Sequence, residues 1–540
     1  MDVVVSALPL ILVVVLMAGP RPQPAWLAVP ITAVFAWVLR LWWFGADGAS
    51  VHAAVAAGLL AAATPLLIVG GAIHLFAVLD RCGALATWRA WLDTVTPHPL
   101  ARVLTVGWAF AYLIEGASGF GTPAALAAPI LVACGMPALR AVVVCLAFNS
   151  VPVSFGALGT PVWFGFAGLD LDAATVTAIG ARSALIHAWC ALPVVVVILR
   201  LAFTWATIRA SWRFVVLAVA ACVLPALAVA QFSAEFPSLI GGGVGLVVTA
   251  LAAQRGWGLG AVDESDRDPP RTPTLPPAPL VVLRAFAPLL ACVVLLVVTR
   301  LPSLPLRGWL TALPQQWWDM GSLGQIGLSP GLTLVWRDIL GTGISERLAI
   351  LFVPGILPFL VVAVITPWLV GSPWANTRGA VRLTVRRLRA PAAALGAGLI
   401  LVRLLQQEDS GAPASTRLLG EALAGGLGPI WHLVAPMLGA LGSFFSGSCT
   451  MANLTFGPVQ LAAATRLGLD PVAVLAGQNV GAAFGNMTCI HNIVAATSIL
   501  GLTRSDHAVL RRTIGPMVFA LVLTGVIGWL LALGFPSEGP

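Results

Sequence analysis

The sequence predicts an all-α polytopic membrane protein with about 12 transmembrane helices and two re-entrant hairpins in an inverted repeat. Of the 540 residues, 59% are hydrophobic and 9% are charged, and the mean hydropathy is +0.96; a soluble protein would carry roughly a quarter charged residues. Apolar runs near the ~20 residues that a bilayer crossing needs recur along the chain. Because lipid offers no partner for backbone polar groups, these runs have to be helices. Polar interruptions at matching places in the two halves indicate the repeat.

The predicted spans follow the apolar runs in chain order. The first run has no basic segment before it and is followed by further spans, so we interpret it as an uncleaved helix rather than a signal peptide. The spans are 3–18, 25–44, 53–79, 138–168, 176–200, 212–231, 237–254, 280–300, 347–370, 390–405, 472–502 and 513–534. Residues 302–345 carry too little pattern for more than the prediction of an outward-facing connection.

The basic residues predict how the chain is oriented. All 29 are Arg, and cytoplasmic loops of membrane proteins collect basic residues. Placing the Arg-rich loops inside puts the N-terminus outside, together with the Arg-poor connections around Asp170 and Glu235. The net charge of +8 therefore indicates orientation in a lipid bilayer, and we expect no nucleic-acid partner. The clusters that we place inside include Arg81, Arg89 and Arg102; Arg200, Arg209 and Arg213; Arg255 and Arg267; Arg378 to Arg389; and Arg504, Arg511 and Arg512.

A Pro-rich polar stretch, residues 256–279, divides the chain. We interpret it as a cytoplasmic linker between an N-terminal membrane half, 1–255, and a C-terminal half, 280–540. The eight Cys are scattered without metal-ligand spacing, and no nucleotide-binding or zinc-protease motif occurs. We therefore expect no metal and no cofactor, and an ATP-driven pump or a metalloprotease is disfavoured.

Two apolar stretches, 101–136 and 429–468, do not fit the alternation of loops as full crossings. Each is long and is interrupted midway by Gly, Ser, Thr or Asn, and must return to the side from which it came. We predict that both are re-entrant hairpins, the first inserted from the cytoplasm and the second from outside. The Arg pattern is consistent only on that assumption.

Each hairpin is followed by a broken span in the same order. The first tip is EGASGFGTP at 115–123, and about two dozen residues later the span 138–168 contains NSVPVSFGALGTP at 149–161. The second tip is SGSCTMAN at 446–453, and at nearly the same interval the span 472–502 contains NVGAAFGN at 479–486. Both halves thus place a Gly/Ser/Thr tip, a return helix, an Asn and a Phe-Gly break in sequence.

Paired, interrupted segments of this kind indicate a transporter site near the middle of the bilayer. Irregular backbone at membrane depth is tolerated only where it is buried in protein or lines a wet cavity. Broken helices expose N–H groups at their new N-termini, which suit a carboxylate. For any single Gly, close helix packing is the simpler explanation, but two matched clusters favour a binding site for a small carboxylate.

At these residues the chain resembles the bacterial lactate permease family, whose members import L-lactate, D-lactate or glycolate with a proton. The resemblance rests on Leu113–Pro161 and on Phe444–Asn453, continuing to Leu502. It implies a secondary transporter rather than an enzyme, a multi-pass location in the bacterial plasma (inner) membrane, and membership of the ion-transporter superfamily. Those folds often move substrate by an elevator-like shift and often form homodimers.

Two positions depart from the family pattern. Cys449 stands where other members have an acidic or amide residue in the second tip, and Asn486 stands where some carry a Lys before Met. If that Lys helps to bind the carboxylate, its absence bears on the substrate more than on the transporter assignment.

Glu115 is the candidate for proton coupling. An intramembrane carboxylate is costly and marks a proton or ion path by default. The alternative is a structural carboxylate that caps backbone N–H groups at the tip. His491 follows the second break and could also carry a proton, although a lone His is more often a packing residue.

Short polar groups at the tips and breaks are the candidates for binding a carboxylate and a 2-hydroxyl group. Singly, each could instead cap local backbone groups. Arg403 lies inside an apolar run and could supply positive charge to the substrate, pair with Glu408 or Asp409, or reach the outer interface. The remaining candidates are Ser118, Gly119, Gly121, Thr122, Asn149, Ser446, Ser448, Thr450, Asn453 and Asn479.

Three functions follow from the sequence. The first is proton-coupled import of lactate, glycolate or a related 2-hydroxy acid. The second is transport of another organic anion or coupling to sodium, which unwound carbonyls at the tips could bind. The third, an intramembrane enzyme, lacks a convincing Ser/His pair or Asp pair.

Overall fold

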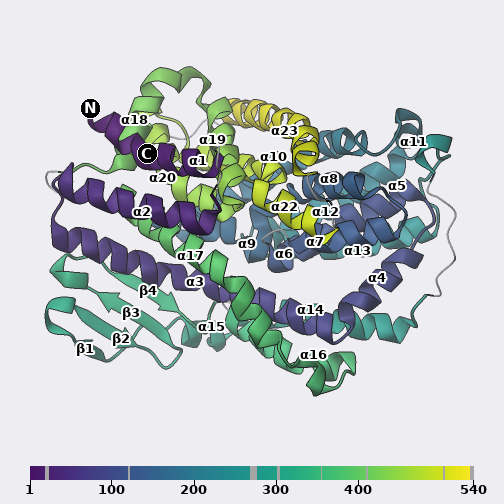
Figure 1. The fold of residues 1–540 in the computed structure, drawn as a ribbon, viewed down its shortest axis with the longest axis horizontal. Helices are drawn as coiled ribbons and strands as arrows, with labels where there is room; N and C mark the ends of the chain where they lie inside the picture. Colours follow the sequence, from purple (N-terminus) through teal and green to yellow (C-terminus); the bar gives the residue numbers. More distant parts are fainter. Residues whose placement is uncertain are drawn as a thin grey trace. The chain divides into compact units, whose positions relative to one another are not determined.

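The computed structural model describes residues 1–18, 23–119, 122–267, 276–300, 304–353, 355–408, 412–500, 502 and 505–534 (Figure 1). The chain forms two compact units. Unit 1 contains Met1–Trp88 and Pro277–Leu419, and unit 2 contains Arg89–Pro276 and Gly420–Pro540. Two of the three boundaries fall inside helices α4 (Ala84–Thr94) and α18 (Ser415–Leu427), and the third lies between Pro276 and Pro277. Each unit thus contains one segment from the N-terminal half of the sequence and one from the C-terminal half. The division of the chain into membrane halves 1–255 and 280–540 describes the repeat and stays a prediction.

Unit 1 is built around two long helices, α3 (Gly48–Arg81) and α17 (Ala380–Gln406), which pack along one another. A Cβ on Gly58 would lie 2.8 Å from Cα of Ile400, so the backbones touch at a residue without a side chain. Asp47 caps the N-terminus of α3 by accepting from Ser50 N. The other helices are α1 (Asp2–Ala18), α2 (Ala25–Trp42), α14 (Pro279–Arg300), α15 (Pro305–Leu310) and α16 (Val362–Val370), the last preceded by a π-helix, Gly355–Val361.

A four-stranded antiparallel meander belongs to unit 1 and makes the all-α expectation incomplete. Its strands are β1 (Trp317–Asp319), β2 (Gln325–Leu328), β3 (Thr333–Arg337) and β4 (Glu346–Ala349), in the order β1-β2-β3-β4. Neighbouring Ile339 packs on Ala53 and Ala57 of α3. The strands are only three to five residues long, and an alternation that short gives little signal in a sequence rich in apolar residues.

Unit 2 begins with a helical hairpin, which we call hairpin 1. Its first arm runs through α5 (Pro99–Arg102), a π-helix (Val103–Phe110) and α6 (Ala111–Ser118), and its second arm is α7 (Thr122–Ala133). The arms pack against one another. A bent segment follows, comprising α8 (Ala138–Asn149), a 3₁₀ turn (Pro152–Phe155) and α9 (Gly156–Trp163), with a bend of 52°.

The second part of unit 2 repeats this order. Hairpin 2 consists of α19 (Trp431–Ser446) and α20 (Cys449–Leu467), and the segment after it is broken into α21 (Pro471–Gly485), a 3₁₀ turn (Asn486–Thr488) and α22 (Ile490–Ile499). The remaining helices of unit 2 are α10 (Ala173–Leu199), α11 (Trp205–Ala210), α12 (Trp212–Ala230), α13 (Pro237–Gln254) and α23 (Asp506–Gly534).

Eight described helices are long and apolar enough to cross a membrane, and nine if the bent pair counts as one span. One of them, Pro99–Ala117, is the first arm of hairpin 1, and it is entirely buried inside the protein. That arm is as long as a full crossing, whereas α7 has 12 residues. The multi-pass architecture follows; the count of 12 spans and the re-entrant character of the hairpins stay predictions.

Candidate functional site

The carboxylate of Glu115 lies at the centre of the candidate site. Glu115 occupies the last turns of α6 and is 3% exposed. Nδ2 of Asn149 donates a hydrogen bond to Oε2 at 3.0 Å. A Cβ on Gly156 would lie 2.1 Å from Oε1, so the chain passes the carboxylate at a residue without a side chain. Asn149 ends α8 and Gly156 begins α9, so the break between the helices holds this carboxylate.

The break itself is strained. Ala157 and Leu158 have left-handed backbone angles, with φ of 44° and 58°, and Gly159 has a φ of 69°. A left-handed residue other than Gly costs about 1–2 kcal/mol. All three are buried, and Nε1 of Trp163 satisfies the carbonyl of Leu158 at 2.8 Å. Strain of this kind, held by surrounding structure, collects at ligand sites.

The tip of hairpin 2 forms a tight turn that starts α20. Gly447 has a φ of 70°, and the side chain of Ser448 accepts from Met451 N as the N-cap. Ser446 donates to the carbonyl of Gly442 at 2.7 Å and accepts from Ser448 N at 3.2 Å. These two Ser therefore shape the turn, and substrate binding by either stays a prediction.

Asn453 and Asn479 meet in the interior of unit 2, and both are fully buried. Nδ2 of Asn453 donates to Oδ1 of Asn479 and to the carbonyl of Pro161, each at 2.9 Å. Nδ2 of Asn479 donates to Ser183 Oγ at 3.1 Å. The amides thus tie the second hairpin to both breaks.

A small cavity brings the two repeats together. Its volume is about 20 Å³, which is room for about one water molecule. Thr160 and Thr450 lie within hydrogen-bonding distance across it, with Oγ1 atoms 3.3 Å apart. The cavity is lined by Glu115, Gly119, Val153, Gly156, Ala157, Thr160, Pro161, Gly447, Ser448, Cys449, Thr450 and Asn486.

The cavity includes both positions that depart from the family pattern. Sγ of Cys449 lies 3.4 Å from Oδ1 of Asn479, and Oδ1 of Asn486 accepts from Asn492 Nδ2 at 2.7 Å. Thr160 was not among the predicted site residues, although it belongs to a Gly-Thr-Pro motif that occurs at both 121–123 and 159–161. That internal repetition was the signal that could have identified it.

A buried Ser-His pair was also missed by the sequence reasoning. Ser154 Oγ lies 2.8 Å from Nε2 of His187, and Ser154 also lies 3.4 Å from the carbonyl of Asn479. His187 contacts the ring of Phe484 edge-on. A single His on an apolar helix gave no signal that it would face the first break.

Several predicted site residues lie away from this cavity or outside the residues that the structure describes. Arg403 is in unit 1, where it forms an ion pair with Glu346, and Glu408 pairs with Arg417. Substrate binding by Arg403 stays a prediction. The side chains of Ser118, Thr122 and His491, and residue Gly121, lie outside the described residues.

Electrostatically, the site is unusual because the described residues place no cation beside its carboxylate. Among the described side chains, Arg and His form no ion pair with Glu115, whose hydrogen-bond partner is the neutral amide of Asn149. Oδ1 of that amide is buried without a hydrogen-bond partner. Asn149 can therefore donate to a carboxylate or, with its amide turned, accept from a carboxylic acid.

Comparison with known proteins decides the family. A family model described as L-lactate permease matches residues 2–534. The chain belongs to the L-lactate permease family. It is 36% identical over 533 residues to the putative L-lactate permease of Haemophilus influenzae, covering 98% of each chain.

More distant members share most of their length with it. The L-lactate permease of Bacillus subtilis is 26% identical, with 86% of this chain and 84% of the relative covered. The glycolate permease GlcA of Escherichia coli is 24% identical, with 99% and 96% covered. The chain is therefore a multi-pass membrane permease and not an enzyme.

Proposed function

We propose that the chain imports lactate, glycolate and related 2-hydroxy monocarboxylates together with protons across the bacterial plasma (inner) membrane. Family membership and the names of its relatives support the substrate class. Glu115 lines the same cavity as the N-terminus of α20, and this carboxylate supports coupling of transport to protons. Association into a homodimer stays a prediction.

The N-terminus of α20 is suited to hold the substrate carboxylate. Ser448, Cys449 and Thr450 line the cavity at the start of a 19-residue helix. Free N–H groups and the helix dipole at such an end favour an anion. The hydroxyl groups of Thr160 and Thr450, which lie 3.3 Å apart in the cavity lining, suit a 2-hydroxyl group of the substrate.

The described residues place no cation beside Glu115, and this supports coupling of transport to protons. A second carboxylate entering this cavity would stand next to an ionised Glu115, and like charges at close range in a dry site cannot both persist. Substrate therefore binds when Glu115 is protonated. One anion and one proton then cross together without net charge.

Substrate binding requires the cavity to widen. A volume of about 20 Å³ accommodates about one water molecule rather than a three-carbon acid. The walls come from the two tips and both breaks, so movement of a tip against a break is the expected opening step.

Uptake of radiolabelled L-lactate into proteoliposomes tests this function. The vesicles have an inward proton gradient and sodium-free buffer, and D-lactate and glycolate serve as competitors. We expect accumulation that a protonophore collapses. Uptake that requires sodium would overturn the coupling ion, and no uptake by folded protein would overturn the substrate class.

A further inference from the structure

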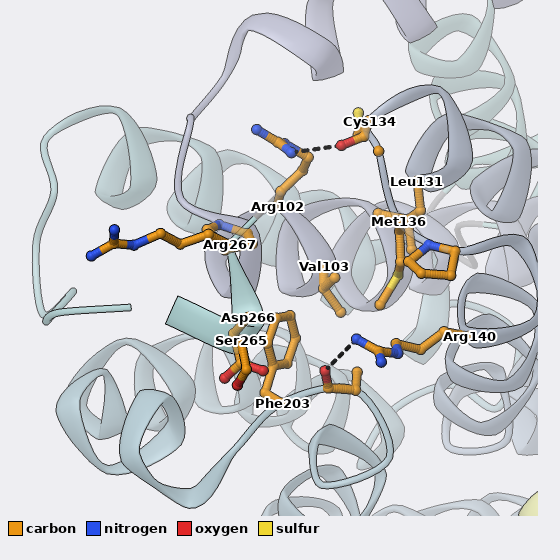
Figure 2. Close-up of a pocket in the computed structure, with 14 residues that line it drawn as sticks. Arg102, Val103, Leu131, Cys134, Met136, Arg140, Phe203, Ser265, Asp266 and Arg267 are labelled. Atoms are coloured by element: carbon orange, nitrogen blue, oxygen red, sulfur yellow. Dashed lines mark hydrogen bonds between the residues drawn. The ribbon is translucent and has the colours of Figure 1, made fainter. Parts of the chain in front are cut away.

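A second, larger cavity lies in unit 2 at the ends of hairpin 1 that are remote from its tip. Its volume is about 220 Å³ (Figure 2). The walls come from the start of hairpin 1, the turn after it, the start of α8, the loop after α10 and the end of the segment 256–267. On the Arg-based orientation, all of these lie on the cytoplasmic side.

Arg140 is the group in this cavity that can bind a ligand. It is partly exposed, and its Nη1 donates to the carbonyl of Ala202 at 3.3 Å. No carboxylate in the described part of the chain forms an ion pair with it. Figure 2 shows Arg140 reaching into the cavity toward Phe203 and Asp266, whereas Arg267 points away. The guanidinium group therefore presents most of its donors to whatever enters.

Two other charged groups of the wall, Arg102 and Asp266, are held by the protein itself. Arg102 is 6% exposed and donates to the carbonyls of Thr96, Pro97 and Cys134. Asp266 is 8% exposed, and its Oδ2 accepts from Thr204 N and from the hydroxyl groups of Thr204 and Thr207. Arg102 thus adds buried positive charge, while the carboxylate of Asp266 is already supplied with donors.

Part of the wall is apolar. Val103, Leu131, Met136 and Phe203 line the cavity together with Arg140. A guanidinium group binds a carboxylate or a phosphate through two parallel hydrogen bonds. An anion with a short apolar body would satisfy both the cation and the apolar wall.

We propose that this cavity is a second binding site, distinct from the Glu115 cavity, for a small water-borne organic monoanion with a short apolar body. The anionic group binds Arg140, and the body contacts Val103 and Met136. Water-borne ligands are favoured over lipid because the exposed rim is made of loop residues such as Ser265 and Arg267. The site joins both ends of hairpin 1 to α8, so its occupation restrains hairpin 1.

A local labelling assay tests the site without depending on transport. All eight native Cys are buried, so Ser265→Cys adds one exposed thiol at the cavity rim. The full chain is placed in nanodiscs of neutral phosphatidylcholine and labelled with a maleimide. At a butyrate concentration ten times its dissociation constant, labelling slows about tenfold, because only the unoccupied fraction reacts.

Matched substitutions separate this site from a general salt effect. Arg140→Gln on the Ser265→Cys background is expected to remove the protection by butyrate. Arg209 is an exposed residue of α11 whose side chain lies over Trp205, outside the cavity wall. Arg209→Gln is therefore expected to keep the protection. If Arg140→Gln does not fold, Arg140→Lys is the alternative. It keeps the positive charge but lacks the paired N–H donors of the guanidinium group, so it should weaken the protection. Undiminished protection in the Arg140 variants, or no protection in their parent, overturns the proposal.

Two further arms identify the ligand class. Inorganic phosphate, which lacks an apolar body, should protect less than butyrate at equal concentration. Nanodiscs of phosphatidylglycerol without free anion should leave the labelling rate unchanged. Stronger protection by phosphate than by butyrate would overturn the proposal that the ligand has an apolar body. Arg140-dependent protection by the lipid alone would show that a lipid headgroup occupies the site. None of these results depends on whether L-lactate is the transported substrate.

Discussion

The amide of Asn149 donates to the carboxylate of Glu115 at 3.0 Å, in a buried site where the described residues provide no cation for that carboxylate. The two residues come from different helices, α6 and α8, and meet because α8 ends at Asn149. An uncompensated carboxylate at such a place is costly unless it is hydrogen-bonded or binds a proton. The pair can therefore hold either the carboxylate or the carboxylic acid of Glu115.

Replacing Glu115 with Gln should abolish proton-driven accumulation while the protein still folds. Gln keeps the size of the side chain and can hydrogen-bond Asn149, but it cannot exchange a proton. We expect accumulation of L-lactate under an inward proton gradient to fall at least about tenfold, corresponding to about 1.4 kcal/mol of lost driving or binding free energy. Thermal unfolding of the purified variant serves as the folding control. Normal accumulation in this variant would remove Glu115 from the coupling mechanism.

Replacing Gly156 with Ala should disturb the same carboxylate from the opposite wall. The added Cβ would lie 2.1 Å from Oε1 of Glu115, a distance that forces either the carboxylate or the break to move. Such overpacking typically costs about 1–3 kcal/mol. Gly528→Ala is the matched control, because a Cβ there meets nothing within 4 Å. Uptake and unfolding temperature should both fall in Gly156→Ala and stay unchanged in Gly528→Ala. Equal values for the two variants would contradict the geometry of the break.

Much of the helical framework could be predicted from the sequence because long apolar runs admit only one regular structure in lipid. The predicted span 237–254 coincides with α13, and 212–231 differs from α12 by one residue. The equivalence of Asn149 and Asn479 was also within reach, because the matched motifs of the two halves place each Asn ahead of a Phe-Gly break. The ion pair between Arg403 and Glu346 was not, because it joins a helix to a short strand 57 residues away, and no local pattern specifies such a contact.

Replacing Asn453 with Ala should destabilise unit 2. The substitution leaves Oδ1 of Asn479 and the carbonyl of Pro161 without the donor that each now has at 2.9 Å. An unsatisfied buried polar group costs about 1–3 kcal/mol. We expect a lower unfolding temperature and lower uptake. Thr465→Ala is a control on the same helix, since its hydroxyl group is exposed and bonds within its own turn; an unfolding temperature that Asn453→Ala lowers no more than Thr465→Ala would refute the structural role of the amide.

Exchanging the charges of Arg403 and Glu346 distinguishes a structural ion pair from a substrate-binding Arg. Both side chains are partly buried, with 33% and 14% exposure. If the pair is structural, Arg403→Glu and Glu346→Arg should each lower the amount of folded protein, and the double variant should restore it with uptake within a few-fold of the parent chain. Double-variant coupling of this kind isolates the interaction between the two residues. A well-folded double variant without uptake would instead support substrate binding by Arg403.

His98, at the start of hairpin 1, should make stability depend on pH. Burial lowers the pKa of His98, the carbonyl of Gly260 opposes that shift, and the charge of Arg102 adds to it. Nδ1 accepts from Ala101 N at 3.4 Å, and Nε2 lies 3.2 Å from the carbonyl of Gly260, so the neutral ring fits both contacts. Because the pKa is lower in the folded than in the unfolded state, the stabilisation is fully present above about pH 6.5 and is lost as the pH falls through the folded pKa. His98→Asn can keep the cap without titrating, so its unfolding temperature should fall less between pH 7.5 and pH 5.5 than that of the parent chain; an identical fall in both would show that His98 does not contribute to the pH dependence.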